Sequence, residues 1–253
     1  MNTRIQLLAA LVSLALVAHA APPASSTTPA PQAVSNAPAA KAAEPVAAPA
    51  AAAGASTTYS VPLPKPMFAG TPATLKTSNL EPARKLTGKQ QFQAPAGCVN
   101  LAAGKPVTSS DTMPVIGELE MVTDGVKDGT EGSYVELGPG LQQVTIDLGK
   151  PAELHAIALW HFHSQARVYR DIIIQLADDP DFIENVRTVY NSDVDNSGKL
   201  GKGTDFEYIE TYEGRLIPLK GEKARYVRLY SNGSTSGDQN HYTEVEVYGI
   251  EGK

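Results

Sequence analysis

The sequence predicts an all-β domain, a jelly-roll β-sandwich, and three observations lead to this fold class. Short segments that alternate polar and apolar residues recur from residue 143 onward, which is the pattern of half-buried strands. Gly, Pro and Asp residues separate these segments, as they do in the turns of sandwiches and barrels. No stretch of the domain keeps a helical period for more than a turn or two.

The candidate strands follow one another closely along the chain. The first, residues 143–148, alternates cleanly and ends at Gly149-Lys150-Pro151. Further candidates are residues 154–162, 169–176, 187–190, 206–210 and 215–219. The last two, residues 224–231 and 242–249, would each bury one face, with Val227, Leu229, Val245 and Val247 toward the core. The polar, glycine-containing loop between these two strands, residues 232–241, is a natural place for a binding site.

The N-terminal segment has the pattern of a secretory signal. Arg4 precedes an apolar run over residues 7–17, and Ala18-His19-Ala20 supplies a small-residue cleavage pattern. We therefore predict a signal peptide over residues 1–20 and an exported protein, periplasmic or secreted. The apolar run is too short for a transmembrane helix, and no other segment approaches the length required.

Composition then divides the rest of the chain in two. Residues 21–96 are dominated by Ala, Pro, Ser and Thr. Such a segment has few large apolar side chains to offset the entropy of ordering, so we predict a disordered tether. Residues 97–253 form the predicted domain, which is long enough for one core.

Charge and cysteine content narrow the possible functions. Residues 1–96 carry seven Lys/Arg and two Asp/Glu, whereas residues 97–253 carry 14 and 25, a net charge of −11. An acidic domain argues against nucleic acid as a partner, because phosphates would be repelled. Cys98 is the only cysteine, so the fold contains no internal disulfide, and we expect this thiol to be buried.

Five segments of the domain match the motifs of one family in their order along the chain: residues 100–110 (NLAAGKPVTSS), 123–125 (TDG), 144–149 (VTIDLG), 226–229 and 244–249. They resemble, in turn, the first strand, the aspartate-glycine loop, the central strand and the closing strands of the discoidin family, also called coagulation factor 5/8 type C domains. The resemblance covers residues 98–250 and implies a galactose-binding-like jelly roll, a fold shared with many bacterial carbohydrate-binding modules. Family members bind glycans, phospholipids or proteins, so the fold does not select the ligand.

The resemblance also implies a structural calcium ion. Family members that bind calcium use the Asp-Gly loop and a glutamate at the start of the last strand. When these family positions are matched to this sequence, the resemblance implies six calcium ligands: Met121, Asp124, Val126, Ser133, Thr243 and Glu244. Carboxylates, hydroxyls and backbone carbonyls are the hard oxygen ligands that Ca²⁺ prefers. The alternative is that Asp124 only caps a turn and Glu244 is a solvated strand residue.

Two further patterns could hold metal ions. Residues 193–198 (DVDNSG) imitate the first half of an EF-hand loop, but position twelve is Thr204 and no helices flank the segment. We interpret it as an Asx-rich surface loop that could hold a second ion. In a strand His161 and His163 share one face and could ligate a transition metal together with His241 and Asp193. The alternative is a pair that only makes hydrogen bonds.

Polar and aromatic residues flank the loops at the predicted strand ends. The predicted rim consists of His161, His163, Arg167, Tyr169, Tyr230, Asn232 and His241. Planar polar groups bind sugar hydroxyls, and an exposed ring packs against the apolar face of a sugar. These side chains could instead tie the loops to each other by hydrogen bonds. Trp160 has the opposite parity to Ile157 and Leu159, so it is either buried on the second face of its strand or a stacking platform.

The sequence does not carry the motifs of common enzymes. It has no Gly-x-Ser-x-Gly elbow, no phosphate-binding loop and no His-Glu-x-x-His helix. We therefore expect an exported, non-catalytic module that binds a glycan or cell-surface polysaccharide through its rim, with calcium bracing the fold. Two alternatives stay open: an envelope adhesion protein that docks on protein or lipid headgroups, and a small metalloenzyme based on the three histidines.

Overall fold

The computed structural model describes residues 56–67 and 74–252. The regular elements of these residues are strands and one short 3₁₀ helix, so the predicted all-β class is confirmed. Their bounds are β1 (Ser56–Val61), β2 (Gln90–Pro95), β3 (Val99–Asn100), β4 (Val107–Ser109), η1 (Leu119–Thr123), β5 (Val135–Leu137), β6 (Gln142–Trp160), β7 (Ile173–Ala177), β8 (Arg187–Asn191), β9 (Arg215–Ser231), β10 (Asn240–Tyr242) and β11 (Glu244–Glu251).

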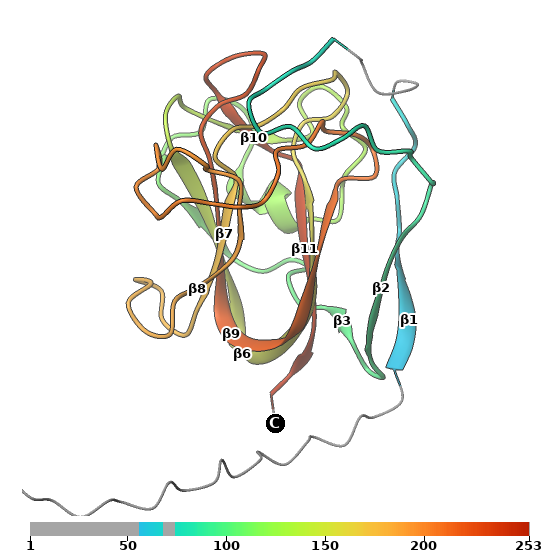
Figure 1. Cartoon of the computed structure of the whole chain (residues 1–253). Coiled ribbons are helices and arrows are strands. Elements are labelled where there is room, and N and C mark those ends of the chain that lie inside the picture. The colour runs from blue at the N-terminus through green and yellow to red at the C-terminus, as the bar shows by residue number, and fades with distance from the viewer. Residues whose placement is uncertain (1–55, 68–73, 253) are drawn as a thin grey trace, which may run out of the picture. The chain divides into compact units, whose positions relative to one another are not determined.

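Two long strands, β6 and β9, belong to both layers of a sandwich. They pair from Gln142 to Asp147 in one stretch and from Ala152 to Leu159 in another, and the register breaks between these stretches. Gly149, with a φ of +86°, lies at this break and supplies a backbone conformation that other residues rarely adopt. Figure 1 shows both strands curving round at this end of the domain. The bend lets one continuous antiparallel sheet form two facing layers.

The two layers differ in the strands that extend them. One layer contains β4, the first half of β6, the second half of β9, β7 and β8. The other contains β3, β11, the second half of β6 and the first half of β9. A separate pair, β5 and β10, lies at the end where the loops meet. The main core lies between the layers and includes the four residues predicted for the closing strands, Val227, Leu229, Val245 and Val247, all fully buried.

The outer face of the second layer is covered by a hairpin that the sequence analysis assigned to the tether. β1 and β2 pair antiparallel, with Tyr59 opposite Phe92. Their buried side chains join a second apolar cluster with Cys98, Trp160 and other residues of β6 and β11. Trp160 is fully buried there, which settles the choice between burial and stacking platform. Cys98 is buried as expected, and burial raises the pKa of its thiol to about 11.

The predicted disordered tether over residues 21–96 is therefore wrong for residues 56–67 and 74–95. The reason is that Val61, Phe92 and Ala94 bury apolar surface against β6, which offsets the entropy of ordering. The signal peptide predicted for residues 1–20 and tether residues 21–55 and 68–73 lie outside the described part of the chain. The predicted strand at 206–210 is also wrong, since only Glu207 makes an isolated bridge, with Leu80.

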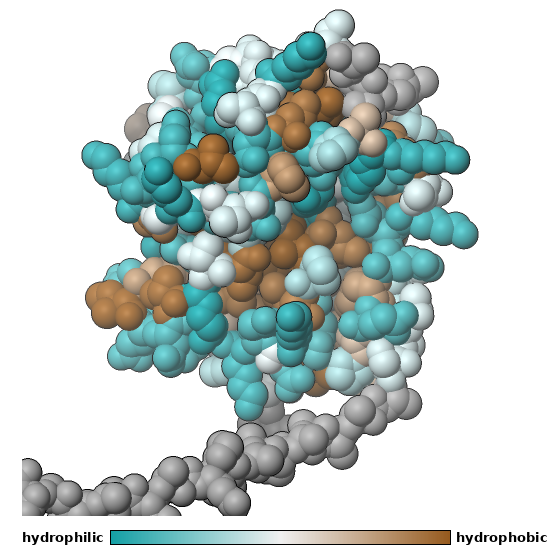
Figure 2. Space-filling view, viewed as in Figure 1, coloured by the Kyte–Doolittle hydropathy of each residue, from teal (hydrophilic) through white to brown (hydrophobic). Residues whose placement is uncertain are grey.

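Hydrophilic side chains cover much of the face of the domain drawn in Figure 2, with apolar areas between them. Among the residues that the structure describes, the most exposed large apolar side chains are Met113 (82%), Ile183 (79%) and Val115 (62%). The described part of the chain includes no helix of the length and hydropathy that a membrane span requires.

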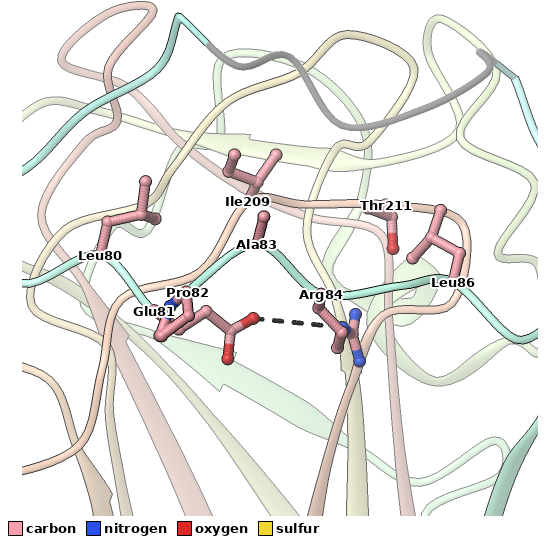
Figure 3. Close-up of a pocket in the computed structure, with 8 residues that line it drawn as sticks. All are labelled: Leu80, Glu81, Pro82, Ala83, Arg84, Leu86, Ile209 and Thr211. Carbon is pink, nitrogen blue, oxygen red and sulfur yellow. Dashed lines mark ion pairs between the residues drawn. The ribbon is translucent and has the colours of Figure 1, made fainter.

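Residues 79–88, which we call the strap, run along the loop at residues 205–214. Glu213 accepts hydrogen bonds from the backbone N–H groups of Thr87 (2.7 Å) and Gly88 (2.6 Å). Glu81 of the strap pairs with Arg215 at 2.7 Å. Figure 3 shows the strap beside Ile209 and Thr211, with its Glu81 and Arg84 facing each other at 4.0 Å. The strap holds this loop in place over the ends of the strands.

Candidate functional site

The predicted rim is largely buried. Six of its residues are less than a tenth exposed: His161, His163, Arg167, Tyr169, Tyr230 and His241. The prediction of an exposed rim is wrong for these six. One reason is that β10 pairs with β5 and places His241 opposite Glu136 inside the domain rather than on a projecting loop.

One buried and one partly buried glutamate contact two of the histidines. His161 Nδ1 and Glu210 Oε1 lie 2.6 Å apart, and both side chains are fully buried. His241 Nε2 lies 3.2 Å from Glu136 Oε2. Burial, together with the positive charge of Arg167, lowers the pKa of His241 to about 4, so this pair is a neutral imidazole bonded to a carboxyl group. These contacts match the alternative in which the side chains tie the loops together.

The three histidines do not form a metal site. His163 Nε2 contacts the backbone carbonyl of Lys127 at 3.0 Å, while His161 contacts Glu210. Within residues 56–67 and 74–252, the one group of three or more metal-binding side chains whose ligand atoms converge is made of aspartates. The alternative in which His161, His163 and His241 share a transition metal therefore has no support in the described residues, whereas the hydrogen-bonded alternative matches the contacts of His161 and His163.

The structure brings the two predicted calcium carboxylates close to the same glycine. Glu244, fully buried, accepts a hydrogen bond from the Gly125 backbone through Oε2 (3.1 Å), and its Oε1 has no partner. Asp124 precedes Gly125 and accepts a bond from the Val126 backbone at 2.7 Å. Burial raises the pKa of Glu244 to about 8, and the charges of Glu246 and Asp124 add to the shift. A buried carboxylate with a free oxygen fits a site for a cation.

The other predicted calcium ligands have different surroundings. Thr243 is fully buried and its hydroxyl has no hydrogen-bond partner. The Met121 sulfur accepts a bond from the Glu118 backbone at 3.5 Å. The Ser133 backbone N–H donates to the Thr130 carbonyl in a turn at 2.9 Å. Asp124, which is exposed, thus meets the buried pair Thr243 and Glu244 only at the Gly125 turn, and the calcium roles of all six residues stay predictions.

A polar hollow opens at the end of the sandwich opposite the bend at Gly149. This loop hollow has a volume of about 430 Å³ and is lined by residues from segments 76–78, 170–171, 192–197 and 232–235 and by Glu207. Asn232, one of the predicted rim residues, lines it and donates a hydrogen bond to Asp171 Oδ2 at 2.8 Å. Tyr230 points elsewhere, with its hydroxyl on Gln175 at 3.2 Å.

Sequence reasoning missed most residues of the loop hollow. Arg170 and Asp171 directly precede the buried run Ile172–Ile174. Polar residues at the end of a buried strand are a pattern that could have marked these two as candidate site residues. Residues 76–78 had no such signal, because they lie in the segment with tether composition. The lining offers carboxylate, guanidinium, amide and hydroxyl groups but no aromatic ring.

Comparison with known proteins gives neither a family nor a curated relative. No family model matches the chain, and no curated protein matches it. Among solved structures, a chitosan-binding module of a chitosanase/glucanase from Paenibacillus sp. IK-5 is 22% identical, with a TM-score of 0.44, over 59% of this chain and 98% of the module. A fucose-binding module from Streptococcus pneumoniae is 22% identical, with a TM-score of 0.41, over 59% of this chain and 97% of the module.

A larger enzyme also matches in part. A family 89 glycoside hydrolase from Clostridium perfringens is 20% identical, with a TM-score of 0.44, over 60% of this chain but only 15% of the enzyme. With TM-scores below 0.5 and identities below 25%, these likenesses support no conclusion about what this chain binds. The β-sandwich itself rests on the strand pairing described above.

Proposed function

We propose that this chain is an exported, non-catalytic carbohydrate-binding protein whose ligand site is the loop hollow. The observation that supports this most is the pairing of Asn232 with Asp171 inside an open, polar hollow at the loop end of a rigid sandwich. An amide and a carboxylate held against each other are pre-organised to exchange hydrogen bonds with neighbouring sugar hydroxyls. Arg170 adds a planar donor to the same wall.

The site differs from the predicted rim in its chemistry. Because no aromatic side chain lines the loop hollow, we expect recognition through hydroxyl groups rather than by stacking on a ring. The motifs that resemble the discoidin family fall on β3, β6, β9 and β11 and on the turn after η1. We propose membership of that family on the basis of this order.

We also propose a structural calcium ion, held by Asp124 and Glu244 with oxygen atoms of Met121, Val126, Ser133 and Thr243. The unpartnered Oε1 of Glu244 and the unpartnered hydroxyl of Thr243 support it. Bound calcium would neutralise a buried carboxylate and link the turn after η1 to the start of β11.

A glycan array with the full chain, in calcium, tests the proposed function. We expect saccharide hits whose binding falls at least tenfold in Asn232→Ala and in Arg170→Ala. Gln239→Ala is the matched control, because Gln239 is an exposed amide of the same loop outside the lining. An array with no saccharide hit would overturn the function. Hits that both hollow variants bind as tightly as the wild type would overturn the site.

A second candidate is docking on an apolar surface, as an adhesion protein would do. Met113 and Val115 favour it, since both are exposed on the segment that follows β4 at the loop end of the domain. Co-sedimentation with phosphatidylcholine/phosphatidylserine vesicles, compared between the wild type and a Met113→Ser/Val115→Ser variant, tests it. Equal sedimentation of the two proteins would exclude these residues as the docking surface.

A further inference from the structure

Three aspartates from two separate loops converge at one end of the domain. Asp171 precedes β7, and Asp193 and Asp195 follow β8. One carboxylate oxygen from each lies within 4.8 Å of the others. Ca²⁺ binds oxygen at about 2.3–2.6 Å, so two ligands on opposite sides of one ion are about 4.6–5.2 Å apart. The three oxygens therefore lie no farther apart than oxygen ligands of a single calcium ion do.

Hydrogen-bond donors hold the aspartates without using all their lone pairs. The Ser197 hydroxyl (2.6 Å) and the Asn232 amide (2.8 Å) both donate to Oδ2 of Asp171, which leaves its Oδ1 free. Asp193 is fully buried and accepts bonds from the backbone N–H groups of Ser197 (3.0 Å) and Gly198 (2.8 Å). Asp195 accepts a second bond from the Ser197 N–H at 3.0 Å. A carboxylate oxygen has two lone pairs, so each can accept an N–H and still face a cation. None of the ion pairs found between described residues includes Asp171, Asp193 or Asp195.

A fourth carboxylate in the same hollow is buried with one oxygen left without a hydrogen-bond partner. Glu207 lines the same loop hollow, is only 8% exposed, and its Oε2 has no hydrogen-bond partner. Two basic residues, Lys76 and Arg170, also line the hollow. Neither of them makes a hydrogen bond to Glu207 Oε2. A cation bound in the hollow would offset the cost of burying the charge of this carboxylate.

We propose that Asp171, Asp193 and Asp195 form a second divalent-cation site of the calcium class. All three are hard oxygen donors on irregular loops, which suits the flexible coordination of calcium better than the strict octahedron of magnesium or the nitrogen and sulfur ligands of zinc. The site requires neither the calcium ion proposed at Glu244 nor carbohydrate binding. A bound ion would join the loop before β7 to the loop after β8 and, through Asn232 on Asp171, fix one wall of the hollow.

Calcium titration calorimetry of the full chain, without any saccharide, tests the site. Asp195→Asn is the main variant, because Asp195 is exposed and asparagine can still accept the Ser197 N–H. Asp171→Asn is the second, because asparagine tolerates the φ of +52° at that position. Asp181→Asn, an exposed aspartate in the turn between β7 and β8, is the matched control.

We expect each of the two cluster variants to bind one calcium ion fewer than the wild type and the control, with unchanged circular dichroism. The cluster variants should keep any ion that Glu244→Gln removes. If both bind as many ions as the control, or if the wild type binds no ion beyond the one lost in Glu244→Gln, the proposal is overturned. Because no saccharide is present, a failed glycan array and a failed calcium titration are separate results.

Discussion

Replacing Glu244 by Gln should remove a large pH dependence from the stability of the calcium-free protein. Glu244 is fully buried, and its carboxyl group has one backbone donor and one oxygen without a partner. Glutamine keeps an acceptor for the Gly125 N–H but cannot ionise. The variant therefore isolates the cost of charging this side chain inside the fold.

The sign and size follow from the raised pKa. The pKa of Glu244 is about 8 in the folded protein against an ordinary value of 4.5. The folded state holds the proton more tightly, so stability is complete below pH 4.5 and is lost as the pH rises toward 8. A shift of this size corresponds to about 5 kcal/mol, at about 1.4 kcal/mol for each pH unit. In a domain of this size, a loss of about 5 kcal/mol lowers the melting temperature by about 10–20 °C.

Thermal unfolding at pH 5, 6.5 and 8, in chelator and in calcium, measures the effect. In chelator we expect the wild type to lose stability across this range relative to Glu244→Gln, and the variant to be the more stable protein at pH 8. In calcium the order should reverse, because the ion stabilises an ionised Glu244 and not the amide. Any contribution from the aspartate site is common to both proteins and cancels in their difference. Parallel pH profiles for the two proteins in chelator would refute the argument.

Three other predictions concern the hairpin, the buried histidine and the strap. Phe92→Ala should lower the free energy of unfolding, measured by urea titration, by about 3–5 kcal/mol. The control Gln91→Ala changes an exposed neighbour and should leave this free energy within about 0.5 kcal/mol, the scale of surface substitutions. Equal losses in the two variants would mean that the hairpin does not pack on β6. Burial lowers the pKa of His241 from 6.5 to about 4, so the free energy of unfolding of the wild type should fall by up to about 3 kcal/mol as the pH drops from 6.5 to 4. Urea titrations of His241→Gln should show a smaller fall over the same range. An equal fall would contradict the conclusion that His241 is buried as the neutral imidazole. Glu213→Gln replaces the carboxylate that accepts two strap N–H groups by a weaker acceptor. Trypsin should therefore cleave after the exposed Lys85 faster in this variant than in the wild type. An unchanged cleavage rate would show that these hydrogen bonds do not hold the strap.

The sequence predicted the core better than the site, and the reason is the range of the interactions. Alternation along residues 224–231 and 242–249 is a local signal, and it placed Val227 and Val247 correctly in the core. His161 and His241 were assigned to an exposed rim because their acidic partners are 49 and 105 residues away. No local pattern identifies a partner at that distance, so polar loop residues that satisfy each other look the same in sequence as residues that face a ligand.

The parity of Trp160 carried more information than the prediction used. In the second half of β6 both faces are apolar, with Ile157 and Leu159 on one side and Ala158 and Trp160 on the other. A strand that is apolar on both faces must be covered on both, and the facing layer of a sandwich covers only one. The second cover has to come from elsewhere in the chain, and the short alternating pairs at 59–61 and 92–94 supply it. A fragment that starts at residue 97 would leave this face bare, so binding assays require residues 56–95 to be present.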